Sequence, residues 1–106
     1  MILNRIRYFE REHGRNADLC FELFANQLAP EKARQLEVLV ERSGILEYES
    51  EHRGPADGEH QISVIVESTD GLHETTACDV PLAAEDEELV TFIKTEGIKL
   101  ANVSKE

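Results

Sequence analysis

The chain has 106 residues, of which 41% are hydrophobic and 31% charged, and its formal net charge is −11. This length is enough for one domain with a single core (residues 1–106) and too short for two. No apolar run approaches the roughly 18 residues of a membrane-spanning helix, and charges run through the first twelve residues, unlike in a signal peptide. We therefore expect a cytoplasmic protein with no membrane association.

The negative charge is unevenly distributed. Residues 1–44 contain seven basic and seven acidic side chains, so the whole excess lies in residues 45–106. Between Ile45 and Ile93 the only basic residue is Arg53, against thirteen carboxylates. Such an asymmetry points to a charged partner surface.

Three helices are predicted in the first half. Over about 2–12, apolar residues have helical spacing, although alternation as a strand is also readable. Over 17–28, Leu19, Cys20 and Leu23 begin an apolar stripe, and no β-branched residue occurs from Ala17 to Glu37. Over 30–43, Pro30 suits a first helical position and an apolar stripe leads to Gly44.

A small antiparallel sheet is predicted next, with strands at about 45–52, 60–68 and 72–80 and a Thr69-Asp70-Gly71 turn. A C-terminal helix follows at 84–96. The fold class is α+β, with the helices first. As an alternative, LVERSGIL and FIKTEGIK have similar endings, with glycines 53 residues apart, which would suit two duplicated strand-helix-strand halves.

Residues 16–68 resemble winged helix-turn-helix domains of the MarR-like class. From Pro30, the chain has the apolar positions, the glycine and the aliphatic pair of a recognition helix entering a wing: Ala33, Leu36, Val40, Gly44, then Ile45-Leu46. The resemblance implies that helix 30–43 lies in the DNA major groove and that the loop 52–60 is the wing.

The charge argues against direct nucleic-acid binding. Phosphate contacts need positive groups. The outward positions of helix 30–43 are mixed in charge, and the wing strands carry mainly carboxylates. A winged-helix shape with this surface would repel a duplex within the screening length.

No motif for catalysis or cofactor binding is recognised. His52, His60 and His73 fall in the β region with Cys78, without the close pairs of a zinc site. Cys20 and Cys78 are expected to be free and buried. We expect no enzyme activity, no metal and no cofactor. Arg7, Arg11 and Arg15 would share one helix face, which could dock the acidic sheet of a second copy in a homodimer.

The leading hypothesis is a small, acidic, non-enzymatic protein that occupies a basic surface of a protein partner, for example a nucleic-acid-binding surface. Anti-CRISPR inhibitors, antitoxins and immunity proteins are of this general kind. A winged-helix transcriptional regulator, or a subunit of one, is the alternative, and a surface acidic only for solubility is the simplest reading. The candidate partner-binding residues are Glu47, Glu49, Glu51, Asp57, Glu59, Glu85, Asp86, Glu87 and Glu88.

Overall fold

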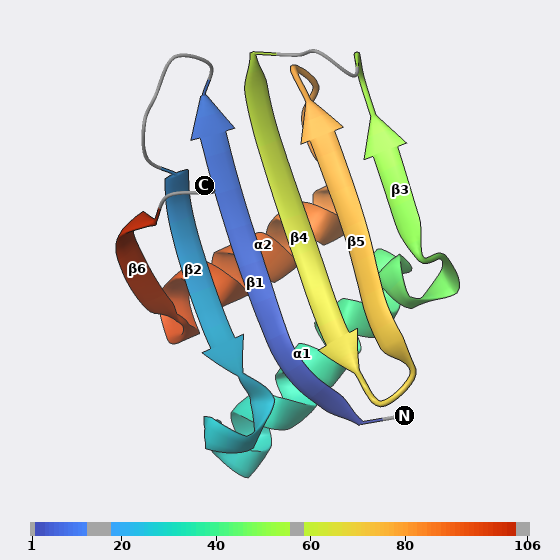
Figure 1. Ribbon diagram of the computed structural model, residues 1–106. Coiled ribbons are helices and arrows are strands. Elements are labelled where there is room, and N and C mark those ends of the chain that lie inside the picture. Colours follow the sequence, from blue (N-terminus) through green and yellow to red (C-terminus); the bar gives the residue numbers. More distant parts are fainter. Residues whose placement is uncertain (1, 13–17, 56–58, 104–106) are drawn as a thin grey trace.

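The computed structural model describes residues 2–12, 18–55 and 59–103, and two helices cover one face of a six-stranded mixed sheet (Figure 1). The sheet order is β3-β5-β4-β1-β2-β6; β3 pairs with β5 in parallel and every other pair is antiparallel. The strands are β1 (Leu3–Glu12), β2 (Asp18–Phe24), β3 (Ser50–Arg53), β4 (His60–Ser68), β5 (Gly71–Cys78) and β6 (Ile98–Val103), the helices are α1 (Pro30–Ser43) and α2 (Ala84–Glu96), and two short 3-10 turns are η1 (Ala25–Gln27) and η2 (Ile45–Glu47).

The first two predicted helices, 2–12 and 17–28, are wrong, because β1 and the described part of 17–28 are mainly strand. In β1, Ile6 and Tyr8 are buried and alternate with Arg5 and Arg7, which is the two-residue period of a strand. β2 has no β-branched residue, but it pairs along both edges, with β1 and β6. Tertiary pairing overrides the weak intrinsic preference there.

The winged-helix prediction is therefore also wrong. Strands precede α1, and the segment after Gly44 does not open a wing. Ile45 and Leu46 form η2, and the strand predicted at 45–52 is only β3, which pairs in parallel with β5. Strand-helix-strand halves do not describe the chain either. Two strands precede α1, three strands lie between α1 and α2, and the edge strands β3 and β6 pair in opposite senses.

Several predicted elements are confirmed. The helices 30–43 and 84–96 and the strand 60–68 have the predicted bounds, and Thr69-Asp70 joins β4 to β5 with Ser68 opposite Gly71. Pro30 is the first residue of α1, and Gly44 ends that helix in the left-handed conformation with φ +74°. These are the segments with one clear period and strong boundary residues.

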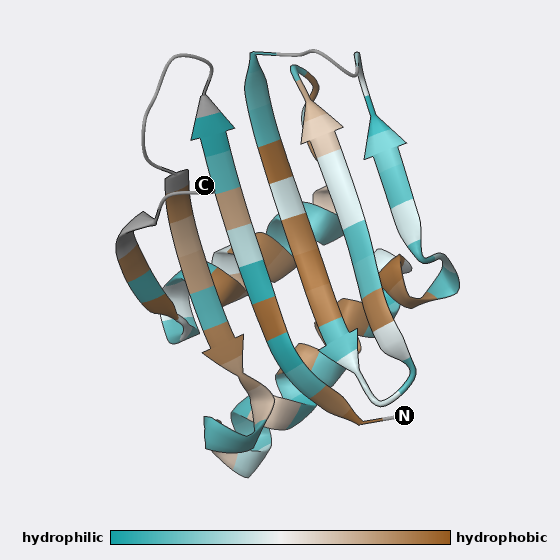
Figure 2. Ribbon diagram, viewed as in Figure 1, coloured by the Kyte–Doolittle hydropathy of each residue, from teal (hydrophilic) through white to brown (hydrophobic). Residues whose placement is uncertain are grey.

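The core lies between the sheet and the helices. Ile6, Val64 and Val66 from the sheet meet Leu36 of α1 and Ile93 of α2, all within 1% of complete burial. Figure 2 shows the middle of β4 as hydrophobic and the edge strand β3 as largely hydrophilic. The sheet thus has one face buried under the helices and one face open.

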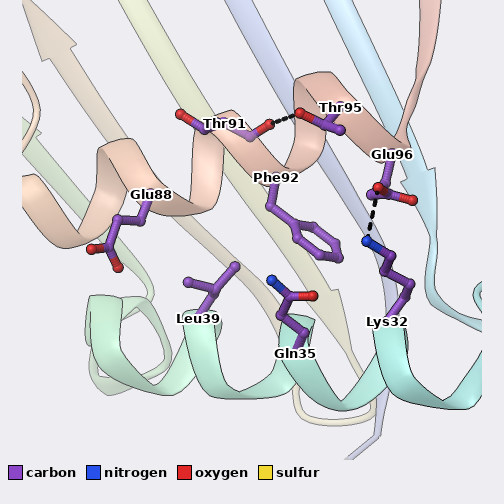
Figure 3. A pocket seen from close by; sticks show the side chains of 8 residues that line it. All are labelled: Lys32, Gln35, Leu39, Glu88, Thr91, Phe92, Thr95 and Glu96. Atoms are coloured by element: carbon purple, nitrogen blue, oxygen red, sulfur yellow. Dashed lines mark hydrogen bonds and ion pairs between the residues drawn. The ribbon is translucent and has the colours of Figure 1, made fainter.

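Two ion pairs tie the helices together. Lys32 pairs with Glu96 at 3.3 Å, and Arg42 pairs with Glu88 at 3.4 Å. Between them lies a groove of about 380 Å³, with Leu39 from α1 and Phe92 from α2 in its lining (Figure 3). Exposed pairs of this kind contribute at most about 1 kcal/mol each, so the apolar core holds the layers together.

Candidate functional site

Carboxylates gather where η2 and β3 meet the beginning of α2, a region called here the acidic edge (Glu47, Glu49, Glu51, Glu85 and Asp86). After α1 ends, the backbone oxygen of Glu49 accepts a hydrogen bond from the nitrogen of Glu74, and β3 then runs beside β5. The loop after β5 brings the first turn of α2 to the same side of the molecule (Figure 1). In the described chain, the outer edge of β3 is unpaired.

Glu51 accepts more side-chain hydrogen bonds than any other described carboxylate of the acidic edge. Its Oε1 accepts hydrogen bonds from the Tyr48 hydroxyl, the Arg53 Nε and the Thr75 Oγ1, each at 3.4 Å. Burial, foremost, raises the pKa of Tyr48, and the charges of Glu51 and Asp86 add to that rise. The hydroxyl therefore stays protonated and remains a donor at neutral pH.

Asp86 is the most unusual group of the site. The residue is 4% exposed, and its side chain has no hydrogen bond or ion pair within the described ranges. Loss of solvation raises its pKa most, and the charges of Glu51 and Glu85 raise it further, whereas the Arg53 guanidinium opposes the rise. Its place in the first turn of α2 offers some compensation from the helix dipole.

The other predicted site residues lie elsewhere or play other parts. Glu59 is exposed at the start of β4, where its backbone nitrogen donates to Asp79. Glu88 faces Arg42 of α1. Glu87 is exposed in the first turn of α2, and Asp57 lies outside the described residues. Of the nine predicted carboxylates, Glu51, Glu85 and Asp86 interact electrostatically at the acidic edge, and Glu47 and Glu49 lie next to Glu51 in the chain.

Three residues of the site were not predicted. They are Tyr48, Arg53 and Thr75, each of which donates a hydrogen bond to Glu51. Strict alternation over 45–52 would have placed Tyr48 on the face opposite the glutamates. The turn η2 interrupts that alternation, so the Tyr48 hydroxyl reaches Glu51 three residues later. The pairing of Glu51 with Thr75 depends on the parallel β3–β5 register, which no local pattern indicates.

Asp79 fixes the neighbouring end of the sheet. Its carboxylate accepts from the backbone nitrogens of Glu59 and His60 at 3.0 and 2.9 Å, and these bonds hold the pKa of Asp79 below its ordinary value. The residue takes φ +56°, which Asp tolerates better than most side chains. Asp79 thereby clamps the start of β4 to the end of β5.

The cysteines and histidines do not form a shared centre. Cys20 and Cys78 are buried and form no disulfide, and Cys20 lies on β2, not on the helix stripe predicted for it. His73 Nδ1 is 2.8 Å from the Tyr48 carbonyl oxygen. Among the described residues, no three His, Cys, Asp or Glu side chains are grouped to hold a metal ion. No helix in the described ranges is long and apolar enough to cross a membrane.

Comparison of the chain with protein-family models, with curated proteins and with solved structures finds no match. Any function for the acidic edge must therefore be argued from its geometry and charge.

Replacing Asp86 by Asn is expected to raise the free energy of unfolding at pH 7. Because the folded-state pKa lies above the ordinary 3.8, the carboxyl group contributes stability below that value and loses it as pH rises through the folded-state pKa. At pH 7 the buried charge is a cost that Asn removes. Urea unfolding between pH 5 and pH 8 measures the effect, and the advantage of D86N should shrink toward pH 5.

Glu85→Gln is the matched control, since it removes a neighbouring charge that is exposed in the same helical turn. Its effect should stay within about 0.5 kcal/mol. Equal effects of D86N and E85Q at pH 7 would show that burial of Asp86 carries no cost.

Proposed function

We propose that this protein is a non-enzymatic binding protein that holds a basic surface of a protein partner on its acidic edge. The burial of Asp86 among other carboxylates carries the proposal. Carboxylates that serve only solubility have no reason to be buried, because desolvating a charge costs free energy. A carboxyl group whose pKa is raised by burial and by neighbouring charges is more often found at a functional site than elsewhere.

A cationic partner group would relieve this cost. Arg53 is the only cation that interacts with the acidic edge among the described residues, and it is already bonded to Glu51. A lysine or arginine of a partner would add the missing opposite charge beside Asp86. The net charge of −11 would also steer a basic partner during encounter.

The outer edge of β3 supplies a second means of recognition. An unpaired strand edge can take up an extended segment through main-chain hydrogen bonds. Glu49 and Glu51 at this edge would favour a basic segment and repel an acidic one, including another copy of the same edge. Edge geometry and charge together support a basic, extended partner segment.

The kind of partner follows from this chemistry: a basic protein surface, for example one that otherwise binds nucleic acid. Inhibitors, antitoxins and immunity proteins act on partners in this way. The alternative of a transcriptional regulator depended on the winged-helix fold and is dropped with it.

Charge reversal at two exposed positions of the acidic edge tests the proposal. Glu49→Lys with Glu85→Lys leaves Glu51 and Asp86 in place, so the fold should be kept. Calorimetric titration with a short arginine-rich peptide is expected to show binding by the wild type and at least about tenfold weaker binding by the variant. Salt should weaken both.

The matched control is Glu31→Lys with Glu37→Lys, which makes the same change in net charge at exposed positions of α1. This control should weaken binding by no more than about twofold. Equal weakening by the two double variants would mean that only overall charge matters, which would favour the solubility reading over a binding site.

A further inference from the structure

The outer edge of β3 presents a defined set of main-chain groups. The backbone oxygen of Glu49 accepts a hydrogen bond from the nitrogen of Glu74, so the main-chain groups of Glu49 point toward β5. Successive residues of a strand direct their N–H and C=O groups to opposite sides. The groups of Glu51 therefore also point toward β5, whereas those of Ser50 and His52 point outward, where no strand of the described chain pairs with them.

The side chains of β3 alternate between the two faces of the sheet. Glu51 lies opposite Thr75, and Thr75 lies opposite Val64, which is buried in the core under the helices. The Glu51 side chain therefore lies on the helix side of the sheet, as do those of Glu49, directly before β3, and Arg53. A strand added at this edge would follow the same alternation, so its residues opposite Glu49 and Glu51 would also direct their side chains to the helix side.

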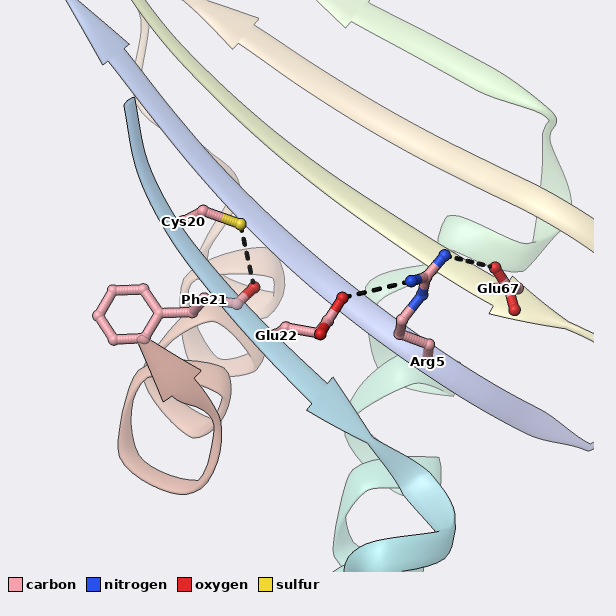
Figure 4. Close-up of polar contacts among 5 residues, drawn as sticks. All are labelled: Arg5, Cys20, Phe21, Glu22 and Glu67. Carbon is pink, nitrogen blue, oxygen red and sulfur yellow. Dashed lines mark hydrogen bonds and ion pairs between the residues drawn. The ribbon is translucent and has the colours of Figure 1, made fainter. Parts of the chain in front are cut away.

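Positive charge is scarce on the helix side of this edge. In the middle of the sheet, by contrast, Glu22 and Glu67 share Arg5, at 3.3 and 3.0 Å (Figure 4). At the acidic edge, Asp86 is 4% exposed, and its side chain has no hydrogen bond or ion pair within the described ranges. Arg53, the described cation that acts on Asp86, is bonded to another carboxylate. The acidic edge is therefore suited to accept a cation from a partner.

We propose that the partner segment held at the acidic edge is an added β-strand whose basic residues occupy alternate positions, opposite Glu49 and Glu51. This pattern rests on the proposed binding function, which it makes more specific. Ser50 and His52 supply the outward main-chain donors and acceptors. Alternate residues of a strand are about 7 Å apart on one face, which is also the spacing of the two glutamates, and the residue between them points away from the helices. Two consecutive basic residues would place only one cation on the helix side.

A second copy of β3 is the competing occupant of this edge. In such a pair, Arg53 of each copy could exchange its contact with its own Glu51 for one with the Glu51 of the other copy. This exchange adds no cation beside Asp86, and it brings together two chains that each have a net charge of −11. A basic segment does add cations, so charge complementarity favours the basic segment.

Two peptides of the same composition test the alternating pattern, acetyl-Thr-Arg-Thr-Arg-Thr-amide and acetyl-Thr-Arg-Arg-Thr-Thr-amide. NMR titration of the full chain at low ionic strength is expected to show at least about fivefold tighter binding of the alternating peptide, because both of its arginines reach the helix side. The amide signals of Ser50 and His52 should shift on binding. Equal affinities would overturn the alternating pattern and leave the proposed function standing, whereas a failure of both peptides to bind would overturn the proposed function itself.

Methylation of the peptide's backbone nitrogens tests the main-chain pairing. In an added strand only alternate residues direct their N–H groups to β3, so methylating either the arginine nitrogens or the threonine nitrogens should weaken binding at least about tenfold, and methylating the other set should leave it unchanged. Loss in the threonine-methylated peptide would indicate an antiparallel strand, since the threonines then lie opposite Ser50 and His52. Loss in the arginine-methylated peptide would indicate a parallel one. Loss in neither peptide, or in both, would overturn the added strand.

Glu49→Gln should abolish the preference for the alternating peptide, because only Glu51 then remains to attract a basic residue on the helix side. Glu47→Gln is the matched control, since Glu47 is also exposed but lies in η2, outside the strand ladder. This control should keep the preference. A preference that withstands Glu49→Gln would overturn the assigned pairing. A wild type that sediments as a dimer, which the alternating peptide does not dissociate, would overturn the proposal in favour of a second copy.

Discussion

Gly54→Ala is expected to detach β3 from the sheet and thereby dismantle the acidic edge. Gly54 has φ +81°, and a Cβ built there would meet the carbonyl oxygen of Cys78, which belongs to the backbone of β5. The left-handed conformation alone costs an alanine about 1–2 kcal/mol. The collision cannot be relieved by a side-chain rotation, so the total should reach about 3 kcal/mol or more.

Detachment and global unfolding give different readouts. If β3 leaves locally, amide hydrogens that β3 shares with β5 lose protection from exchange while those of β1 and β4 keep theirs. Binding to the arginine-rich peptide should fall together with that protection, because Glu51 and Arg53 lie on β3. A fall in the urea midpoint shared by all probes would indicate that β3 is part of the global unit.

Gly44→Ala is the matched control. Gly44 has a similar φ of +74°, but an added Cβ would meet only the end of the Glu47 side chain, at 3.2 Å. Its cost should be that of the left-handed conformation, about 1–2 kcal/mol. The difference between the two variants therefore isolates the collision with β5. If the two variants lost the same free energy of unfolding, the backbone of Gly54 would have to lie farther from the Cys78 carbonyl oxygen than it does in the structure.

The confirmed parts of the fold are those in which local signals agree. In α1, the proline at the first position, the apolar stripe and the terminal glycine all indicate one helix, and α2 and β4 are similarly consistent. The segment 2–12 fits both a helical and a strand pattern, whereas the segment 17–28 fits a helical one, and the pairing of β1 with β2 and β4 makes both segments strands. The secondary structure of these segments depends on tertiary contacts, so the local sequence pattern does not determine it.

The sequence predicts that carboxylates form the acidic edge, but it does not predict which carboxylates lie close together. The run of carboxylates after residue 45 is visible in the sequence, and of the nine predicted residues Glu51, Glu85 and Asp86 interact electrostatically in the structure. Glu51 and Asp86 meet only because β3 lies parallel to β5 and the next loop returns α2 to the same side. Arg7 and Phe9 show the same limit, because they lie on one face of the sheet only once β1 is known to be a strand.

Leu36→Ala is expected to be the most damaging truncation in α1. Leu36 is fully buried in the core under the sheet. Truncation of a buried leucine costs about 2–5 kcal/mol, and Leu36 also lines a cavity of about 260 Å³, so the new space would be continuous with an existing one. We therefore expect about 3 kcal/mol, which in a domain of this size lowers the Tm by roughly 15 °C.

Val38→Ala is the control on the same helix, because Val38 is 48% exposed and faces away from the core. Its effect should stay within about 0.5 kcal/mol. The stripe of apolar residues in the sequence already separates the two positions, whether α1 belongs to a winged helix or to this sheet. Thermal unfolding in which both variants lose similar stability would contradict the burial of Leu36, and with it the way α1 is packed beneath β1 and β4.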